Sequence, residues 1–516
     1  MTRLRHRFLA RGQTSSRILA AVILGGTMLL GGCAVGPRYS RASAPVPPDY
    51  KETPPNWKPA QPSDQALRGK WWEIYRDAQL NALEEKINVS NQTLKAAQAQ
   101  FEQARATVHY NRADYYPTIT AGVSATRERL SANRPGNTIG PITTNDLILP
   151  LDMSYEPDVW GRVRRTVEAA RSNAQASLAD LELVSLSLHA ELATDYFQAR
   201  ELDAEAHLFD STVANYQRAL DLTESRYQGG VASQVDVAQA QTILETARAQ
   251  DIDVREARTQ YEHAIAVLIG VPASTFTLEF AALNATPPVT PPGLPSELLE
   301  RRPDIAAAER QMAAANANIG IAKAAYFPLF NFSPNAGFEG SSVVNWLSSP
   351  SAFVSVGASA VVTAFDVGRR RAASDQARAA YDQAVANYRQ NVLTAYQEVE
   401  DNLAGLRLLE QEANTQAAAV AAAEHSLALS ENRYRGGVTS YLEVTTAQTI
   451  ALADERAAVQ ISGRRMVDSV LLIKALGGGW NSASLYTVNM DTRSPVSNSS
   501  VSGSSVPSSS PASRTP

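Results

Sequence analysis

Glu224-Ser-Arg-Tyr-Gln-Gly-Gly-Val-Ala-Ser-Gln-Val-Asp-Val-Ala-Gln-Ala-Gln-Thr-Ile243 reappears later in the chain as Glu431-Asn-Arg-Tyr-Arg-Gly-Gly-Val-Thr-Ser-Tyr-Leu-Glu-Val-Thr-Thr-Ala-Gln-Thr-Ile450. The two stretches lie 207 residues apart (431 − 224), and 12 of their 20 aligned positions are identical. Arg112-Ala-Asp-Tyr-Tyr-Pro117 and Lys323-Ala-Ala-Tyr-Phe-Pro328 form a second pair at an offset of 211 (328 − 117). Periods of about 20–50 residues are typical of solenoids. This longer period therefore indicates two copies of one whole domain.

Segments without hydrophobic periodicity separate and flank the two copies, which span residues 71–280 and 297–481. Residues 33–70 are rich in Pro, and we expect them to run as an extended segment. Residues 281–296 form a Pro-rich linker, because Pro fixes φ and removes a backbone donor. Residues 482–516 are rich in Ser and Pro and bury too little apolar surface to fold, so we expect a disordered tail.

The first 32 residues have the pattern of a bacterial lipoprotein signal peptide. A basic segment precedes an apolar run from Ile18 to Leu30, which is short for a transmembrane helix. Leu30-Gly-Gly-Cys33 then resembles a lipobox, in which the cysteine is acylated after cleavage. A buried free thiol is the alternative for a lone cysteine. The position of Cys33 favours lipidation, and Ala34, in place of a retaining Asp, favours the outer membrane.

Composition argues against nucleic-acid binding and against enzymatic activity. Net charge is −5 and charged residues make up 19% of the chain, without a basic excess. The six His and one Cys form no close metal-binding pair, and Gly477-Gly-Gly479 lacks the rest of a phosphate loop. No Gly-x-Ser-x-Gly motif occurs. We therefore expect no catalytic residue, no metal and no cofactor beyond a covalent lipid on Cys33.

Each copy has the same predicted order of helices. The first helix covers about Ala78–Arg112 in one copy and Pro303–Tyr326 in the other. A very long helix follows over about Gly161–Tyr227 and Gly368–Tyr434, and a shorter one returns over about Ser233–Ile269 and Ser440–Leu476. Apolar residues in the first long helix recur every three or four positions, which makes one stripe. About 65 residues at 1.5 Å give roughly 100 Å, a length that indicates a coiled-coil or tubular assembly.

Two segments of about ten residues in each copy alternate between apolar and mostly polar residues, which predicts four β-strands. The apolar positions are Ile119, Ala121, Val123, Ala125, Leu147, Leu149, Leu151, Met153, Tyr155, Phe330, Phe332, Ala336, Phe338, Ala352, Val354, Val356, Ala358 and Ala360. This length and period suit transmembrane strands, and a half-buried soluble sheet has the same alternation. Four strands cannot close a barrel, so membrane strands would require several chains.

These features together resemble the TolC-like outer-membrane channels of tripartite efflux pumps, within them the OprM-like lipoprotein branch. The resemblance covers roughly residues 33–481. It rests on four motifs: Cys33-Ala-Val-Gly-Pro-Arg-Tyr39, Trp71-Trp-Glu-Ile-Tyr-Arg-Asp77, Leu294-Pro-Ser-Glu-Leu-Leu-Glu-Arg-Arg-Pro-Asp304 and Lys474-Ala-Leu-Gly-Gly-Gly-Trp-Asn481.

The resemblance implies an α+β membrane protein that assembles as a homotrimer. Its twelve-stranded β-barrel would continue into an α-helical periplasmic tunnel. The implied partners are a periplasmic membrane-fusion adaptor protein, an inner-membrane resistance-nodulation-division pump and outer-membrane lipid, with no nucleic acid. The implied function is a passive duct that exports small molecules such as drugs. Alternatives are a metal-ion or protein export duct of the same fold, or a lipid-anchored structural coiled coil.

The repeated motif marks the turn that ends each long helix, since glycine adopts positive φ without strain. In the resembled family, adaptor hairpins dock around this tip. The matching positions are Arg226, Tyr227, Gly229, Gly230, Val231, Arg433, Tyr434, Gly436, Gly437 and Val438.

Four residues beyond the turns are candidates for a periplasmic gate. Asp236 and Glu443 would each form a carboxylate ring in a trimer, and such rings favour cations. Leu442 matches an apolar ring of OprM-like relatives, and Thr446 stands where many relatives carry a second acid. Compensation of the helix dipole is the simpler role for an acid near a helix start.

Overall fold

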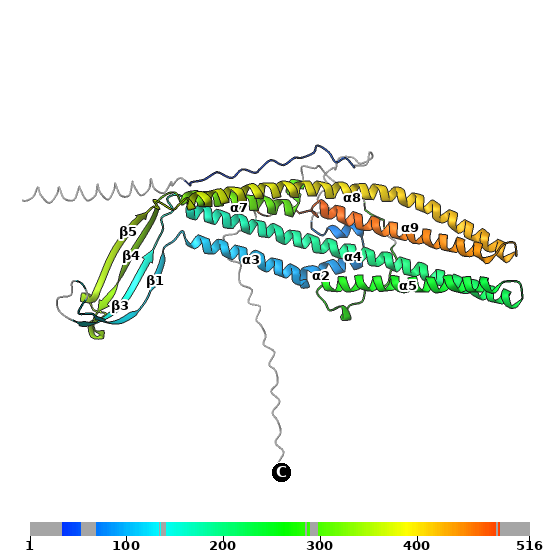
Figure 1. Ribbon diagram of the computed structural model, residues 1–516, viewed down its shortest axis with the longest axis horizontal. Coiled ribbons are helices and arrows are strands. Elements are labelled where there is room, and N and C mark those ends of the chain that lie inside the picture. The colour runs from blue at the N-terminus through cyan, green and yellow to red at the C-terminus, as the bar shows by residue number, and fades with distance from the viewer. Residues whose placement is uncertain are drawn as a thin grey trace, which may run out of the picture.

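The computed structural model describes residues 34–52, 69–133, 135, 141–283, 286–288, 298–480, 483 and 485. The predicted signal peptide, Cys33, most of the linker and nearly all of the Ser/Pro-rich tail lie outside these residues. Within them the chain is elongated. A small β-sheet occupies one end, and helices run from it to the opposite end, where two loops close two helical hairpins (Figure 1).

The four helices that form the two hairpins confirm the sequence prediction to within one residue. Helices α4 (Arg162–Gln228) and α8 (Arg369–Arg435) each have 67 residues. Helices α5 (Gln234–Leu268) and α9 (Tyr441–Ala475) return along them and have 35 residues each. At 1.5 Å per residue, each long helix extends about 100 Å. The equal lengths show that the duplication preserves the hairpin.

The prediction of one continuous helix over about Ala78–Arg112 in copy one is wrong. This segment is divided into α2 (Ala78–Ser90) and α3 (Gln92–Ala113) at Asn91, which has extended backbone dihedrals. The Asn91 side chain accepts a hydrogen bond from the amide of Leu94 at 2.8 Å and donates one to the carbonyl of Leu268 at 2.7 Å. Asn91 therefore caps α3 and holds it against the end of α5. The counterpart in copy two, α7 (Pro303–Ala324), is continuous.

Short elements join the main ones. They are the helical turns η2 (Trp71–Tyr75), η3 (Ala273–Thr275), α6 (Leu298–Arg301), η5 (Val343–Asn345) and η6 (Ser349–Ser351).

The sheet has four strand positions, as the sequence predicts, although one strand is interrupted. The segments are β1 (Thr118–Ala121), β2 (Ser124–Leu130), β3 (Ile142–Ser154), β4 (Leu329–Gly340) and β5 (Ala352–Val361). Both β1 and β2 pair with β3 in one register, so they are two parts of one strand. Between them, the amide of Gly122 donates to the carbonyl of Pro150 at 3.1 Å. Proline has no N–H to return a bond, which explains the break.

All pairs in the sheet are antiparallel, in the order β1/β2, β3, β4, β5. Residues that pair directly lie on the same face. The register places Val123 and Leu149 together, and it opposes Leu151 to Ala336 and Phe332 to Ala358. The predicted apolar positions of β1–β5 therefore share one face, while Thr, Ser, Asn and Asp dominate the other. The outer strands, β1/β2 and β5, each have one edge without a partner strand in the described chain.

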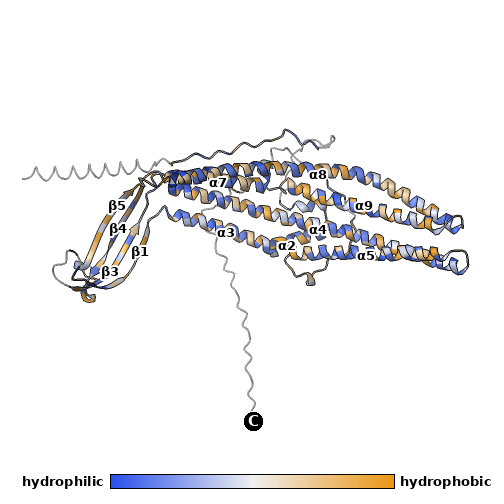
Figure 2. Cartoon of the chain, in the orientation of Figure 1, coloured by the Kyte–Doolittle hydropathy of each residue, from blue (hydrophilic) through white to orange (hydrophobic). Residues whose placement is uncertain are grey.

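Helix α4 is the centre of the helical body, where it packs against α3, α5, α7 and α9, while α8 packs against α7 and α9. Hydrophilic and hydrophobic residues alternate along all the long helices (Figure 2). No helix within the described residues is both long and apolar enough to cross a membrane. Near the middle of the body, Trp71, Tyr196, Phe197, Ile265 and Met466 belong to one buried cluster that joins the two copies.

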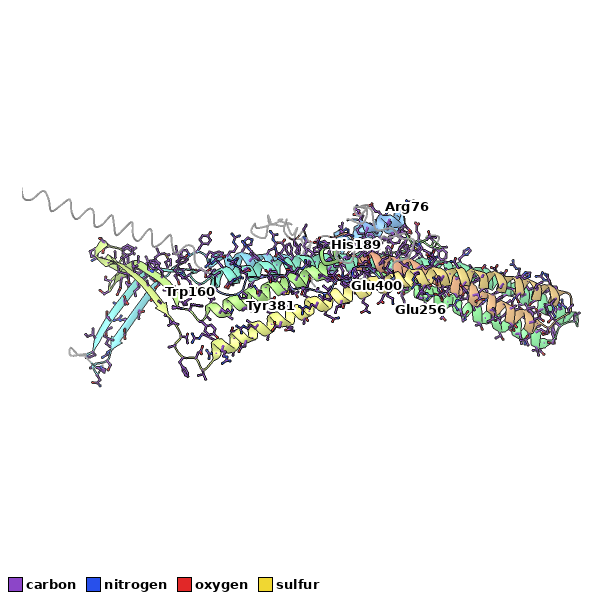
Figure 3. All side chains as sticks on the ribbon, turned by 90° about the horizontal axis from the view of Figure 1, so that it is seen from above. Arg76, Trp160, His189, Glu256, Tyr381 and Glu400 are labelled. Carbon is purple, nitrogen blue, oxygen red and sulfur yellow. The ribbon has the colours of Figure 1, made fainter. Side chains whose placement is uncertain are left out.

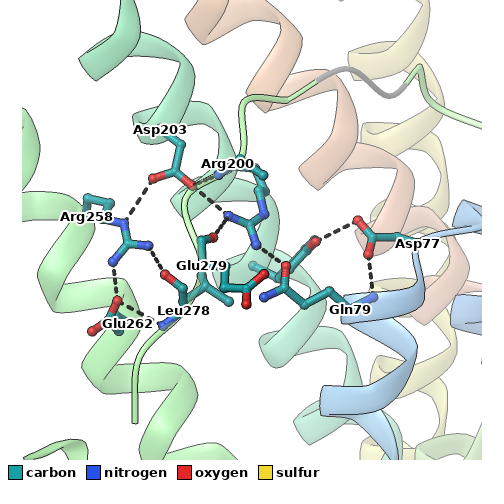
Figure 4. A network of polar contacts seen from close by, with 10 residues as sticks. Asp77, Gln79, Arg200, Asp203, Arg258, Glu262, Leu278 and Glu279 are labelled. Carbon is teal, nitrogen blue, oxygen red and sulfur yellow. Dashed lines mark hydrogen bonds and ion pairs between the residues drawn. The ribbon is translucent and has the colours of Figure 1, made fainter.

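A buried ion network fixes the middle of copy one (Figure 4). Asp203 is fully buried between two arginines: it accepts from Arg200 at 2.6 Å and from Arg258 at 3.0 Å. Arg200 also donates to the backbone carbonyl of Glu279 at 2.6 Å, and Arg258 to that of Leu278 at 2.5 Å. Helices α4 and α5 are thereby tied to the chain that leaves copy one.

Most of the described part of the predicted extended segment, residues 34–52, has no regular secondary structure and lies along the helices of copy two (Figure 1). Arg41 donates to the hydroxyl of Tyr388 at 3.1 Å. The backbone amides of Lys51 and Glu52 donate to the Glu400 carboxylate at 2.7 and 3.0 Å. This segment therefore fastens the amino end of the chain along the outside of α7 and α8.

Candidate functional site

The loops at the far end of the hairpins have the same turn geometry in both copies. Gly230 has φ +74° and Gly437 has φ +72°, whereas Gly229 and Gly436 have ordinary helical φ. The amide of Val231 donates to the carbonyl of Arg226 at 2.8 Å, which is the long bond of a Schellman motif. Only the second glycine of each pair is required by backbone conformation.

The two copies differ in how they expose the tyrosine of the repeated motif. Tyr227 is 46% exposed, whereas Tyr434 is only 6% exposed and packs edge-on against Tyr441 at 5.2 Å between ring centroids. Val231 and Val438 are about equally exposed, at 70% and 71%. The tips therefore share a backbone and an exposed valine but present different side chains around it.

The same arginine of the motif has two different partners. Arg226 of copy one reaches the other hairpin, where its guanidinium lies over the ring of Tyr434 and donates to the carbonyl of Arg435 at 3.2 Å. Arg433 of copy two stays within its own hairpin and pairs with Glu443 at 3.0 Å. Arg226 is thus a link between the two hairpins.

The structure places three of the four gate candidates together. Leu442, Glu443 and Thr446 line one shallow hollow on the hairpin of α8 and α9, with a volume of about 380 Å³. Leu442 is 57% exposed there, and the hydroxyl of Thr446 donates to its carbonyl at 2.8 Å. The hydroxyl of Thr439 donates to Glu443, whose carboxylate is therefore held by two neighbours.

Asp236 lies on the other hairpin and has a local role. Its carboxylate accepts from the backbone amide of Ser233 at 2.9 Å, and its amide donates to the Ser233 hydroxyl at 3.2 Å. This is a capping box at the start of α5. Asp236 therefore has a role at the start of its own helix within a single chain. Its place in a gate stays a prediction. Cys33 lies outside the described residues.

A cavity between the hairpins is a feature that the sequence did not predict. It has a volume of about 460 Å³ and is lined by residues from α4, α8 and α9, including Tyr216, Tyr434, Tyr441 and Gln448. Among the residues that the structure describes, the hydroxyl of Tyr434 is buried and has no hydrogen-bond partner. A buried polar atom without a partner is costly, so this space is suited to water.

Two further titratable groups were missed because nothing in their local sequence indicates their burial. Burial raises the pKa of Glu84 to about 9 and lowers the pKa of His189 to about 4, although their side chains approach to 2.6 Å. Both shifts favour a neutral pair joined by a hydrogen bond. The ring of Trp72 stacks on His189 at 4.3 Å. Over the part of the chain that the structure describes, no group of three or more His, Cys, Asp or Glu could hold a metal ion.

Residues 83–271 and 294–478 match the protein family described as outer membrane efflux protein. The toluene efflux pump outer membrane protein TtgC of Pseudomonas putida is 32% identical over 465 residues, which cover 88% of this chain and 94% of that protein. The pyoverdine export outer membrane protein OpmQ of Pseudomonas aeruginosa is 30% identical over 468 residues, with coverage of 89% and 97%.

Among solved structures, the outer-membrane channel OprN superposes with a TM-score of 0.81 at 31% sequence identity. The match covers 87% of this chain and all of that one. The two matched segments of the family correspond to the two copies found by internal comparison, so the similarity extends over the sheet, both hairpins and both tips.

Proposed function

Because this chain belongs to the outer membrane efflux protein family, it is the outer-membrane channel of an efflux pump, and we propose that three copies form one passive duct. In this duct the sheets join into a barrel in the outer membrane, and the helices continue as a tunnel in the periplasm. The duct catalyses no reaction and binds no nucleic acid, and its energy comes from a partner.

The register of the sheet carries this proposal. One face is apolar across all four strand positions, and each of the two outer strands has one edge that no strand of the described chain pairs with. In hydrocarbon, each unpaired backbone group costs several kcal/mol. Pairing β1/β2 of one chain with β5 of the next removes both edges. Three chains then give a closed barrel of twelve strands with its apolar face toward lipid.

The hairpin tips form the entrance and the docking site of this duct. Val231, Val438 and Tyr227 are exposed apolar side chains at the very end of the molecule. They suit the membrane-fusion adaptor that links the channel to a resistance-nodulation-division pump. Leu442, Glu443, Thr446 and Asp236 form the closed gate. Small organic molecules are the cargo, in keeping with the toluene and pyoverdine named for its relatives.

A lipid on Cys33 is the second attachment to the outer membrane. The lipobox and Ala34 support this assignment. One acyl chain alone binds a membrane only weakly, so we assign the barrel the main anchoring role and the lipid a positioning role.

Cysteine cross-linking between strand edges tests the assembly. Ile119→Cys on β1 would be combined with Ala358→Cys or Ala360→Cys on β5, because all three positions share the apolar face. Oxidation in outer membranes should give covalent dimers and trimers with no higher species. Each single variant is the control and should form no trimer. Chains that remain monomeric in both pairs, or that form a ladder beyond three, would contradict the proposed barrel.

A further inference from the structure

The first described residues are held at the junction between the sheet and the helices. The amide of Val35 donates to the carbonyl of Trp160 at 3.0 Å. Ala34 lies so close to Gly161 that a Cβ on this glycine would come within 2.9 Å of the Ala34 Cα atom. Gly161 also has φ +81°, which other residues rarely adopt. Figure 3 labels Trp160 at this junction. The position next to Cys33 is therefore fixed.

Two helices show in which direction the chain leaves this contact. The carbonyl of Pro37 accepts from Asn316 of α7 at 3.3 Å and from Arg165 of α4 at 3.1 Å. One residue earlier, Gly36 packs on Gly320 of α7, where an added Cβ would come within 2.6 Å of the backbone. From Pro37 back to Gly36, the contact with α7 thus shifts by one helical turn, from Asn316 to Gly320. The next turn of α7 is Ala324.

Ala324 lies in the wall of a groove at the same junction. The groove has a volume of about 360 Å³ and is formed by the end of α7, the start of α4 and the adjoining ends of β4 and β5. Its apolar members are Pro157, Val159, Trp160, Ala324, Ala325, Phe327, Pro328, Leu329, Phe330 and Val361. The Trp160 ring stacks on Phe327 at 4.7 Å, and its N–H donates to the carbonyl of Pro328 at 2.8 Å.

The apolar surface of this groove is accessible in the described chain. Phe327 is 39% exposed. Leu329 and Val361 pair with each other on the opposite face of the sheet from Phe330, so they form only the far border of the groove. The charged groups at its border are already paired, since Arg162 donates to Glu156 at 2.8 and 2.6 Å. Tryptophan is also typical of the level at which a membrane meets water. Such an apolar surface at the membrane–water boundary fits an uncharged hydrocarbon chain.

We propose that this junction groove, defined by Trp160, Ala325, Phe327 and Phe330, is the binding site for an acyl chain carried by Cys33. The inference rests on the lipidation proposed above. Because Ala34 is held at Gly161, the attached acyl chain begins beside the groove and lies along the aromatic side chains instead of in bulk lipid. The lipid therefore fixes the amino segment to the first turn of α4 and the last turn of α7.

A photoactivatable fatty acid tests this site in the full-length protein in outer membranes. Cells are grown with a diazirine-bearing palmitate analogue and irradiated, and the purified protein is digested and analysed by mass spectrometry. The expected product is a peptide containing Cys33 joined through its acyl chain to a peptide containing Trp160 or Phe327. Ala325→Phe fills the groove and should reduce this product at least fivefold, while Ala325→Ser, which leaves the groove open, should not.

Each other outcome counts against the site. Full acylation of Cys33 without a cross-link to the groove would overturn the proposed site and leave lipidation intact. Equal labelling of the groove in Cys33→Ser would show that it takes membrane phospholipid instead. No fatty acid on Cys33 at all, detected before irradiation, would overturn both the lipidation and the site that depends on it.

Discussion

The guanidinium carbon of Arg226 lies 4.7 Å from the centre of the Tyr434 ring, and this contact joins the last turn of α4 to the last turn of α8. The two residues occupy neighbouring places in two copies of one motif. In their own copies they have different environments, because Arg433 pairs with Glu443 and Tyr227 is exposed. Among the described residues, the duplicated motif thus forms one Arg–Tyr contact across the hairpins where exact symmetry would give two.

Arg226→Ala should loosen the contact between the two hairpin tips. The change removes a cation–π contact and a hydrogen bond to the carbonyl of Arg435, which together contribute about 2 kcal/mol. Single-channel recordings in planar bilayers should show a higher mean conductance. Arg433→Ala is the control, because it also removes one positive charge from the tip. Its partner Glu443 belongs to the same hairpin, so no contact between the hairpins is lost. Equal conductance of the Arg226 variant and the unaltered protein would show that this link does not hold the tip.

A charge on one face of the sheet should have a different effect from a charge on the other. Val356→Lys places a charge on the apolar face and should cost about 2–4 kcal/mol near the membrane midplane, which lowers the yield of assembled trimer. Ser355→Lys, its neighbour on the polar face, should assemble normally. Phe332→Lys and Asn331→Lys form a second matched pair. The yield is measured as detergent-resistant, heat-modifiable oligomer, and similar losses on both faces would contradict a membrane sheet.

Removing the two tip acids should change ion selectivity. Asp236→Asn keeps an acceptor for the helix cap while removing the charge, and Glu443→Gln does the same beside Thr439. If both acids line the aperture, the double variant should lose cation selectivity in reversal-potential measurements, most clearly at low salt, where screening is weakest. Leu442→Ala should instead raise conductance, because it removes an apolar constriction. Unchanged selectivity in the double variant would place the constriction elsewhere.

The second glycine of each tip should be the sensitive one. Gly437→Ala forces a side chain into left-handed backbone, at a cost of about 1–2 kcal/mol. Gly436→Ala is the matched control, because its φ of −75° suits any residue. The temperature at which purified oligomers dissociate should fall for Gly437→Ala and stay unchanged for Gly436→Ala. Equal shifts would mean that close packing by a partner, instead of φ, requires these glycines.

Glu201 should make stability depend on pH. Burial raises its pKa to about 7, Glu205 adds to this shift, and Arg464 opposes it. A carboxyl in the unfolded chain ionises near its ordinary value, about 4.3. Between these two values the unfolded state binds fewer protons, so stability falls as pH rises. Glu201→Gln should reduce the fall of the unfolding midpoint between about pH 4.5 and 7, and the part that remains comes from other buried acids such as Asp195. Glu245→Gln, at an exposed position, should retain the slope.

The sequence predicted the helices and strands well where glycines mark their ends or where apolar and polar residues alternate. Gly161, Gly368 and the Gly-Gly tips set the ends of α4 and α8, and the alternation in β1–β5 predicted which residues share a face. The break at Asn91 was missed because an asparagine within a polar helix carries no clear signal. Its capping role depends on Leu268, which is distant in sequence.

The surroundings of the site residues could not be predicted for a similar reason. Tyr227 and Tyr434 stand at the same position of the Arg-Tyr-x-Gly-Gly-Val motif. Tyr434 is buried by Tyr441 of its own hairpin and by Arg226 of the other hairpin. The burial of Glu201 likewise depends on Gly463 of α9, whose missing side chain leaves room for the carboxylate. Packing against side chains outside the motif sets both environments.

The unequal exposure of Tyr227 and Tyr434 has a consequence for stoichiometry. In a trimer the ring of tips contains two kinds of hairpin, which alternate around the axis with threefold rather than sixfold symmetry. A partner with six identical subunits around this ring would meet an exposed tyrosine at every second position. Its subunits would therefore make two kinds of contact, three with an exposed tyrosine and three without.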